Sequence, residues 1–352
     1  MRPRLPVSIR VHASWILVAC CTGATLMAAQ QLPPPHPVPQ IAPQPTFTAW
    51  LAAFRADAAG RGISEATLDR ALDGLEPLPV VVDRDRSQAE IVLTLDQYLE
   101  RRLTRAMVKT ARQMAARHRS LLQKVSAKYG VPPTVIVAIW GLESNFGRFS
   151  GVRPTIATLA TLAYDPRRSA MFREELIDAL KILDHGDVEP AAMRGSWAGA
   201  LGQPQFMPSS FLEFAQDFDG DGRRDIWKSM PDVFASIANY LSAHGWTKGQ
   251  TWGREVKVPS AIADRVAEAA PLQIEGCLAE RQMTVALPLR EWRSLGVTTV
   301  AGARLPNSDV DASLVAAGPR RFLVYPNYQA LLAYNCVHAY GLSVALLSDR
   351  GR

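Results

Sequence analysis

The 352-residue sequence has little excess charge. Its formal net charge is +6, and three of its basic residues, Arg2, Arg4 and Arg10, precede any acidic one. Without the first 29 residues the chain has 36 basic and 33 acidic residues, an excess of only +3. A nucleic-acid-binding domain normally has a strong basic patch. The composition therefore gives no support for a nucleic-acid partner, although it is compatible with an anionic polymer.

The apolar run near the N-terminus is too short to span a bilayer. It covers residues 13–19, whereas a membrane helix needs about 20 apolar residues. Together with the basic residues before it, this run predicts an export signal over residues 1–29. Two cleavage sites remain open. Residues 17–20 (Leu-Val-Ala-Cys) resemble a lipobox that would leave Cys20 acylated, whereas residues 27–29 (Met-Ala-Ala) suit ordinary signal peptidase and a soluble product.

Cysteine is scarce as well, with four residues in the chain. Cys277 and Cys336 are the two that follow the leader. An exported protein reaches an oxidising compartment where disulfides persist. We therefore predict a bridge between Cys277 and Cys336, whose geometry the sequence does not test.

Residues 30–45 form a proline-rich tract without charge, which predicts an extended spacer. The pattern then becomes helical as far as residue 130. Trp50, Leu51 and Phe54 share one helix face, and Ser64 begins a second helix. Residues 91–119 form a long amphipathic run, followed by a helix over 120–129.

Residues 131–151 contain an apolar run that ends in one carboxylate. Prolines at 132 and 133 suit a helix start, and residues 135–142 are almost wholly apolar, which predicts a helix buried on all sides. Glu143 follows, and Gly147 and Gly151 are expected to end the helix and let the chain turn. Burial raises the pKa of a carboxyl group, and an acid that stays protonated near neutral pH suits general acid catalysis. A helix cap or surface ion pair is the alternative role for Glu143.

Two neighbouring segments carry polar groups in unusual settings. Arg167 and Arg168 precede a helix expected over residues 170–184, where the helix dipole does not favour a cation. One interpretation is that one of these two arginines binds a ligand. The alternative is that it belongs to a solvated surface. Residues 194–211 combine glycines, aromatics and the polar side chains of Ser196, Gln203 and Gln205, which suits either a sugar-binding loop or a turn-rich connection.

Residues 217–228 resemble an EF-hand calcium loop. Acids occupy loop positions one, three and five, a glycine occupies position six, and a main-chain carbonyl serves at position seven. These residues are Asp217, Asp219, Asp221, Gly222 and Arg223. Position twelve is Lys228 instead of the usual glutamate, and Asp232 is the candidate for the missing ligand. We predict a structural Ca²⁺ site.

The last third of the chain changes character. A helix is expected over residues 233–244, and residues 284–287, 298–300 and 321–325 are typical of strands. Residues 328–347 return to helix and contain Tyr334, Asn335 and Tyr340.

Taken together, these segments resemble the lytic murein transglycosylase B family. The resemblance runs from about residue 47 to 350 and is carried by residues 131–147, 159–168, 195–210, 217–222, 238–240 and 334–335. It implies a mainly α (α+β) fold. A helical subdomain (46–130) would precede a lysozyme-like core (131–250), followed by a small β subdomain (253–325) and a return to the core (326–352).

The resemblance also implies an activity. Family members cleave the MurNAc–GlcNAc β-1,4 bond of peptidoglycan without water, closing the muramic acid C6 hydroxyl onto C1 to leave a 1,6-anhydroMurNAc end. Glu143 would first protonate the leaving oxygen and then, as a carboxylate, accept the C6 hydroxyl proton. One acid suffices for this reaction, whereas ordinary glycosidases need a pair.

Further roles follow from motif position. Ser196 would position the N-acetyl group or Glu143, and Arg167 or Arg168 would reach the peptide stem or lactyl group. The glycan groove would be lined by Gln205, Tyr240, Tyr334 and Asn335. The metal would be held by Asp217, Asp219, Asp221, Arg223 and Asp232, and no organic cofactor is implied.

The sequence departs from the family pattern at two places. Pro204 stands at a position where family members commonly have glycine, and Val337 stands where they often have serine. The resemblance therefore does not fix the detailed contacts to the substrate. We expect a periplasmic monomer, either soluble or anchored to the outer membrane through Cys20. No wall-binding module follows Arg352, so targeting would come from the catalytic region or the anchor.

Three alternative functions remain. One is a muramidase-type hydrolase, which needs a path for water, and another is a catalytically silent peptidoglycan-binding scaffold. A calcium sensor is least compatible with the sequence, because one loop without a paired partner rarely senses calcium.

Overall fold

The computed structural model describes residues 44–86 and 94–351. The expected export signal, nearly all of the proline-rich tract and the start of the amphipathic run at 91–93 lie outside the described residues. The chain divides into two units, Met1–Gln44 and Pro45–Arg352, and the description below concerns the second unit.

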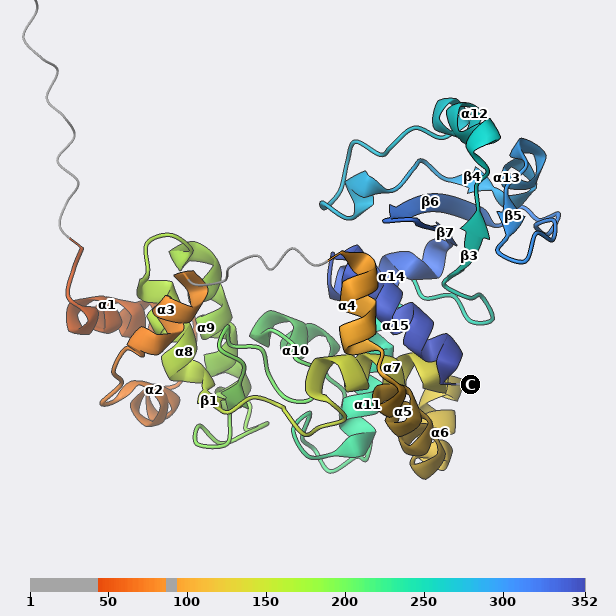
Figure 1. Ribbon diagram of the computed structural model, residues 1–352. Helices are drawn as coiled ribbons and strands as arrows, with labels where there is room; N and C mark the ends of the chain where they lie inside the picture. The colour runs from red at the N-terminus through yellow and green to blue at the C-terminus, as the bar shows by residue number, and fades with distance from the viewer. Residues whose placement is uncertain (1–43, 87–93, 352) are drawn as a thin grey trace, which may run out of the picture. The chain divides into compact units, whose positions relative to one another are not determined.

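One hydrophobic core is formed by helices from two separate parts of the sequence (Figure 1). The first part contributes α1 (Phe47–Gly60), α2 (Glu65–Leu72) and α3 (Pro79–Arg86). These helices pack with α8 (Thr155–Tyr164), α9 (Ser169–Asp184) and α10 (Pro208–Phe214). The predicted helix start at Ser64 is confirmed, because its hydroxyl accepts a hydrogen bond from the Thr67 amide and caps α2.

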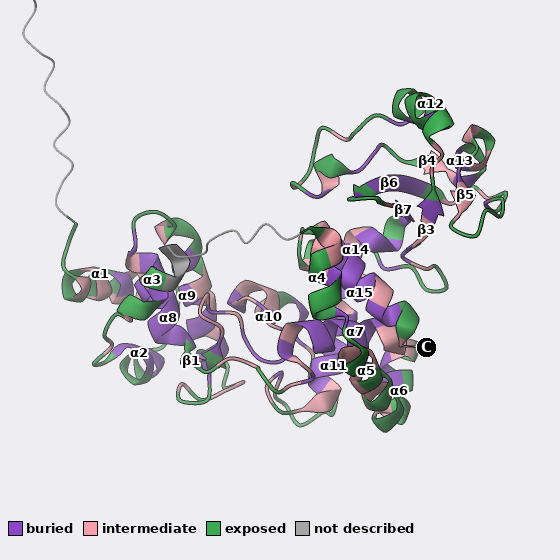
Figure 2. Ribbon diagram, viewed as in Figure 1, coloured by how far each residue is buried: buried purple, intermediate pink, exposed green. Residues whose placement is uncertain are grey.

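A second core surrounds α7 (Pro133–Ser144), whose residues from Val135 to Leu142 are all buried (Figure 2). Around it pack α4 (Leu95–Arg102), α5 (Arg105–Arg117), α6 (Arg119–Tyr129), α11 (Met230–Ala243), α14 (Pro326–Tyr334) and α15 (His338–Arg350). The prediction of a helix buried on all sides is therefore confirmed. It needs no amphipathic stripe, because neighbouring helices cover every face of it.

Two expected continuous helices are each broken. The amphipathic run at 91–119 contains α4 and α5, separated where the Thr104 hydroxyl caps α5 by accepting from the Met107 amide. The helix expected over 328–347 is instead α14 and α15, which meet at 118°. The break places Asn335 at the end of α14 in an extended conformation. Apolar periodicity continues across both breaks, so the sequence pattern did not indicate them.

The third core lies under a five-stranded antiparallel sheet with strand order β4-β6-β7-β3-β5. The strands are β3 (Gly253–Lys257), β4 (Leu287–Pro288), β5 (Thr298–Thr299), β6 (Asp311–Ala317) and β7 (Arg320–Val324). The strands predicted at 298–300 and 321–325 are present within a residue. The one predicted at 284–287 was wrong, because regular pairing begins only at Leu287 and Thr284 makes an isolated bridge.

Other elements of this region were not predicted. They are β3, β6 and the helices α12 (Ala263–Ala269) and α13 (Leu289–Leu295). β6 has three alanines, which are poor strand formers. Its place in the sheet comes instead from pairing with β7 and from burial of residues such as Val315. A separate small pair, β1 (Arg153–Pro154) and β2 (Arg194–Gly195), lies between the helical segments.

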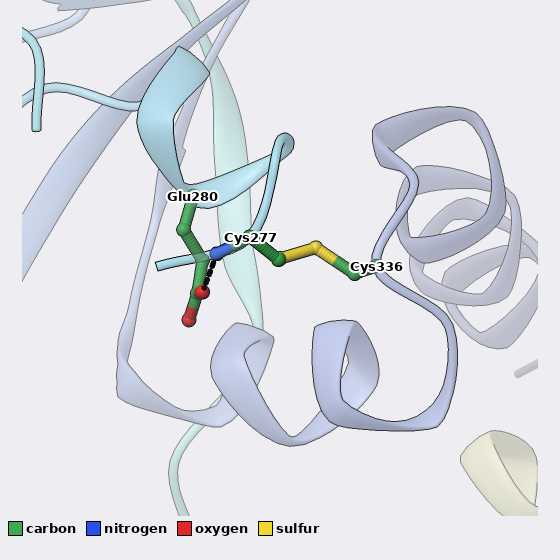
Figure 3. A group of neighbouring side chains, drawn as sticks. All are labelled: Cys277, Glu280 and Cys336. Carbon is green, nitrogen blue, oxygen red and sulfur yellow. Dashed lines mark hydrogen bonds between the residues drawn. A yellow bond between two sulfur atoms is a disulfide. The ribbon is translucent and has the colours of Figure 1, made fainter. Parts of the chain in front are cut away.

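The predicted disulfide is confirmed, because Cys277 and Cys336 are bonded with 6.5 Å between their Cα atoms (Figure 3). It joins a turn of the sheet region to the break between α14 and α15. Within residues 44–86 and 94–351, no single helix is both long and apolar enough to cross a membrane.

Candidate active site

Glu143 lies in the last turn of α7, at the point where the chain turns sharply. Asn145 and Phe146 have φ values of 50° and 58°, so the helix ends at Ser144, three residues before the expected Gly147. A positive φ is uncommon for a bulky residue such as Phe146. The Phe146 ring packs so closely on Gly141 that a Cβ atom there would lie 2.7 Å from it. This turn leaves Glu143 partly exposed at the end of an otherwise buried helix.

The surroundings of Glu143 favour its protonated form. Burial raises the pKa of this carboxyl group to about 7, while the Tyr340 hydroxyl and the positive charge of Arg102 oppose the shift. The Tyr340 hydroxyl is buried, and among the described residues it meets no partner with the geometry of an ordinary hydrogen bond, so its contact with Glu143 is a loose one. Arg102 reaches the same place because its Nη2 donates to the Leu142 carbonyl at 2.9 Å.

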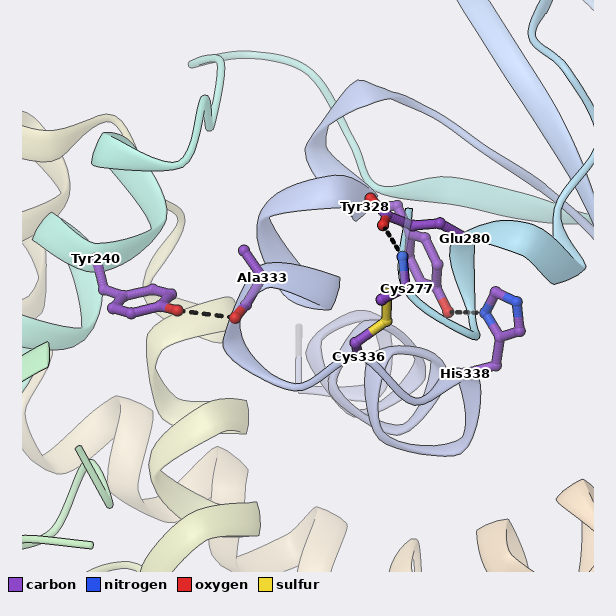
Figure 4. The surroundings of a disulfide bond; sticks show 7 residues. All are labelled: Tyr240, Cys277, Glu280, Tyr328, Ala333, Cys336 and His338. Carbon is purple, nitrogen blue, oxygen red and sulfur yellow. Dashed lines mark hydrogen bonds between the residues drawn. A yellow bond between two sulfur atoms is a disulfide. The ribbon is translucent and has the colours of Figure 1, made fainter. Parts of the chain in front are cut away.

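Three tyrosines form a connected group beside this acid. Tyr334 and Tyr340 stack with 6.2 Å between ring centroids, and burial and the charge of Glu143 both raise their pKa values. The Tyr334 hydroxyl donates to the Pro204 carbonyl at 2.8 Å. Tyr240 packs 4.7 Å from Tyr334 and donates to the Ala333 carbonyl at 2.8 Å (Figure 4). Tyr240 is buried, so it supports the Tyr334 side chain from behind.

The break between α14 and α15 is held on several sides. Cys336 is bonded to Cys277, and the Cys277 amide donates to Glu280 Oε2 at 2.7 Å (Figure 4). The Tyr328 hydroxyl lies 3.1 Å from His338 Nδ1. Asn335 sits between these contacts with an exposed side chain. The break therefore presents Tyr334 and Asn335 on a fixed support.

In the loop over residues 194–207, the side chains of Ser196 and Gln205 form hydrogen bonds to main-chain groups of the loop itself. Ser196 Oγ accepts from the amides of Ala198 (3.2 Å) and Ala200 (3.1 Å). Gln205 has a φ of 56°, and its Nε2 donates to the Gly202 carbonyl at 2.7 Å. Across the described ranges, neither side chain makes a hydrogen bond to Glu143. Both are partly exposed.

Gln203, the third polar residue of this loop, connects three segments. It accepts from Trp140 Nε1 at 2.6 Å and donates through Nε2 to the Trp227 carbonyl at 2.7 Å. A Cβ atom at Gly147, where φ is 77°, would lie 2.4 Å from its Oε1. Gln203 is buried, so it belongs to the scaffold that joins α7 to the metal loop.

The two arginines at the start of α9 are engaged locally. Arg167 Nη2 pairs with Asp165 Oδ2 at 2.9 Å, and Arg168 lies with its guanidinium 5.5 Å from the centre of the Phe172 ring.

The predicted metal loop brings three carboxylates together. The ligand atoms of Asp217, Asp219 and Asp221 lie within 4.8 Å of one another, and within the described part of the chain none pairs with a basic side chain. Asp232 lies in the first turn of α11, and its carboxylate accepts from the amides of Phe218 (2.8 Å) and Asp225 (2.9 Å).

The electrostatics of this loop fit a hard cation. Burial and the charges of Asp219 and Asp217 together raise the pKa of Asp232 to about 6, although the two amide hydrogen bonds lower it. The Ser229 hydroxyl donates to Asp219 Oδ2 at 2.7 Å. Clustered carboxylates that disfavour one another's ionisation form the oxygen-rich donor set that Ca²⁺ prefers.

Three residues near Glu143 were not predicted as site residues. Tyr340 stands out in the sequence only as a tyrosine in an apolar helix. Arg102 and Tyr98 lie on the short helix α4, with the Arg102 guanidinium 6.0 Å from the centre of the Tyr98 ring. Nothing local in the sequence connects this helix to Glu143.

A helical core of lysozyme-like fold, a small sheet and one acid with a pKa near neutrality define the class of lytic transglycosylases. The chain belongs to the family with the Transglycosylase SLT domain, whose model matches residues 46–349.

Individual relatives agree with this assignment. A segment of 122 residues is 45% identical to membrane-bound lytic murein transglycosylase B of Escherichia coli (strain K12), covering 34% of this chain and 34% of that relative. The crystal structure of SltB3 from Pseudomonas aeruginosa in complex with NAG-anhNAM-pentapeptide matches with a TM-score of 0.80 and 43% identity. The match covers 87% of this chain and 80% of the SltB3 chain.

A more distant structure carries a metal. The Escherichia coli lytic transglycosylase Slt35 in complex with calcium matches with a TM-score of 0.70 and 26% identity, covering 86% of this chain and 92% of that one.

Proposed function

We propose that this chain is a peptidoglycan lytic transglycosylase that cleaves the MurNAc–GlcNAc bond without water. The observation that carries the proposal is Glu143, an acid with a pKa of about 7 at the end of a buried helix. The causes of its pKa shift are burial, the Tyr340 hydroxyl and the charge of Arg102, and no carboxylate is among them. The two-carboxylate mechanisms of retaining and inverting glycosidases therefore have no evident partner group here.

Glu143 acts as acid and then as base in this scheme. At neutral pH about half of the molecules carry its proton, which passes to the departing glycosidic oxygen as the C1–O bond breaks. The carboxylate that remains accepts the proton of the muramic acid C6 hydroxyl as its oxygen bonds to C1. The charge of Arg102 and the loose contact from Tyr340 stabilise the carboxylate form between these two steps.

The neighbouring residues bind and orient the glycan. Tyr334 lies near Glu143, Asn335 follows it at the break between α14 and α15, and Tyr240 holds Tyr334 in place. Ser196 and Gln205 contribute from the opposite loop, and Arg167 or Arg168 contacts the peptide stem. The support for these roles is the position of each residue in the family motifs, and for Tyr334 also the effect of the Glu143 charge on its pKa.

The test is the mass of the products. Purified peptidoglycan digested by the wild-type protein should give muropeptides one water lighter than muramidase products, and the Glu143→Gln variant should give none. Reducing ends of normal mass would instead identify a hydrolase. Binding without any cleavage by the wild-type protein would identify a silent scaffold.

The metal and the location belong to the same proposal. A structural Ca²⁺ would be held by Asp217, Asp219, Asp221, Asp232 and the carbonyl of Arg223. The carboxylate cluster and the calcium complex of Slt35 support this site.

The protein would act in the cell envelope on glycan strands, as a soluble monomer or through a lipid anchor at Cys20. The names of its relatives support that location.

A further inference from the structure

Helix α5 carries a stripe of positive charge that the proposed reaction does not use. Between Glu100 and Glu143 the sequence contains nine lysines and arginines and no acid. Arg105, Lys109 and Arg112 lie at spacings of four and three residues, so they share one face of α5. All three are exposed.

Several cations elsewhere in the described part of the chain form ion pairs. Arg55 on α1 makes ion pairs with three acids, and Arg61 makes ion pairs with two. By contrast, in the part of the chain that the structure describes, Arg105, Lys109 and Arg112 make none. Like charges at these spacings destabilise a helix. The stripe is therefore not explained by the stability of α5.

The stripe lines a groove. A cavity of about 590 Å³ lies between α5 and the end of α15, with Arg105, Lys109, Arg112 and Arg350 along its sides and the apolar Leu103 and Val108 beside them. A second cavity of about 420 Å³ shares Arg112 and continues to Arg119. Arg112 Nε donates to the Arg350 carbonyl at 2.8 Å, which fixes one wall of the groove.

We propose that this groove is a second, non-catalytic binding site for extended peptide chains that carry carboxylates, such as the peptide stems of the substrate polymer. This identification of the ligand rests on the proposed function. Alternate side chains of an extended peptide are about 6.6 Å apart. Successive cations on α5 are spaced by about 6 and 4.5 Å along the helix axis, which is close enough for flexible side chains to pair with such carboxylates.

The shape of the site favours a peptide over a lipid surface. A flat array of anionic headgroups meets exposed basic residues best on a protruding face. Here the cations border a shallow groove whose lining also includes the apolar Leu103 and Val108, which suits the backbone and methyl groups of a single chain.

The proposal is tested by co-sedimentation with intact peptidoglycan, with Glu143→Gln in every protein so that the polymer is not digested. Arg105→Gln, Lys109→Gln and Arg112→Gln are combined in one variant. The matched control combines Arg117→Gln, Lys124→Gln and Lys257→Gln, which removes the same charge outside the groove. A further variant with Arg105→Lys and Arg112→Lys keeps the charge. Circular dichroism and thermal unfolding verify that each variant is folded.

We expect the dissociation constant of the groove variant to rise about tenfold at low salt, since three exposed charge contacts are lost. The control and the lysine variant should stay within about twofold of the parent. On glycan stripped of its peptides, all proteins should bind equally.

Other outcomes overturn the proposal. Equal losses for the groove and control variants would mean that only net charge matters. A groove effect that persists on stripped glycan would exclude peptide stems, and an effect seen only with vesicles of anionic phospholipid would identify a membrane surface instead. Failure of the proposed function is recognised separately, because the protein with Glu143 intact would then give no anhydro products.

Discussion

At the scale of single residues, the site depends on one acid whose proton affinity is set by its neighbours. Burial raises the pKa of Glu143, and Tyr340 and Arg102 lower it. The balance leaves the pKa at about 7, where an acid can both give and take a proton. The same balance makes Glu143 unfavourable for stability once it ionises.

The Glu143→Gln variant should be more stable than wild type at alkaline pH. The pKa of Glu143 is about 7 in the folded protein and 4.5 in the unfolded chain. The stability that this group contributes is complete below pH 4.5 and is lost as pH rises through 7. Glutamine does not titrate, so its advantage should grow between pH 5 and 8 to a ceiling of about 3 kcal/mol. Thermal unfolding at both pH values measures this, with Glu268→Gln on exposed α12 as the control.

If the advantage of Glu143→Gln is the same at pH 5 and pH 8, the carboxyl group is not desolvated as described. The interpretation of Glu143 as a protonated acid would then be wrong.

Replacing Tyr340 with phenylalanine should shift the pH dependence of activity. The Tyr340 hydroxyl lowers the pKa of Glu143, so its loss should raise that pKa. Because the first step needs the protonated acid, the decline of activity at alkaline pH should move upward by up to about one unit. The measurement is kcat/KM against pH, with Tyr129→Phe on α6 as the matched control. A downward shift would contradict the inferred contact between Tyr340 and Glu143.

At the scale of elements, the site is assembled by turns and breaks. Two left-handed residues follow α7 and leave Glu143 partly exposed, and the break between α14 and α15 brings Tyr334 and Tyr340 beside it. The disulfide between Cys336 and Cys277 links this break to the sheet region. The metal loop, in turn, is joined to α7 through Gln203.

Removing the disulfide should weaken both stability and catalysis. The bridge closes a loop with a sequence separation of 59 residues, and its loss should cost about 2–4 kcal/mol of unfolding free energy. Since Cys336 is adjacent to Asn335, the variant with Cys277→Ser and Cys336→Ser should also have a lower kcat. Thermal unfolding and turnover below the unfolding temperature separate the two effects. An unchanged kcat would show that the remaining contacts suffice to hold the break.

Calcium should stabilise the protein through the loop at 217–232. At a concentration 100 times the dissociation constant, a ligand specific for the folded state adds about 2.7 kcal/mol. For a chain of this size that corresponds to a rise in Tm of about 5 °C. A chelator should reverse the rise, and Asp217→Asn should abolish it, whereas Asp264→Asn on α12 should not. A Tm unaffected by calcium and chelator would refute the site.

At the scale of the whole molecule, segments far apart in the sequence form each core. The helices before residue 87 pack with α8 and α9, and α4 and α5 pack with α15 and α7. The helical character of these segments could be predicted, because apolar spacing, prolines at helix starts and capping side chains act locally. The strand β6 could not be predicted, since its alanine-rich sequence forms a strand only when paired with β7.

Features that depend on neighbouring residues can be predicted from the order of amino acids. That order placed a carboxylate at the end of a wholly apolar helix, it arranged Asp217, Asp219 and Asp221 at loop spacing, and it left two cysteines to pair. The groups that surround Glu143, by contrast, become known from the folded chain. Tyr340 and Arg102 reach it from helices distant in the chain, and Gln203 is drawn into the scaffold. Burial and contact at long range set the pKa of an acid, and no local pattern encodes them.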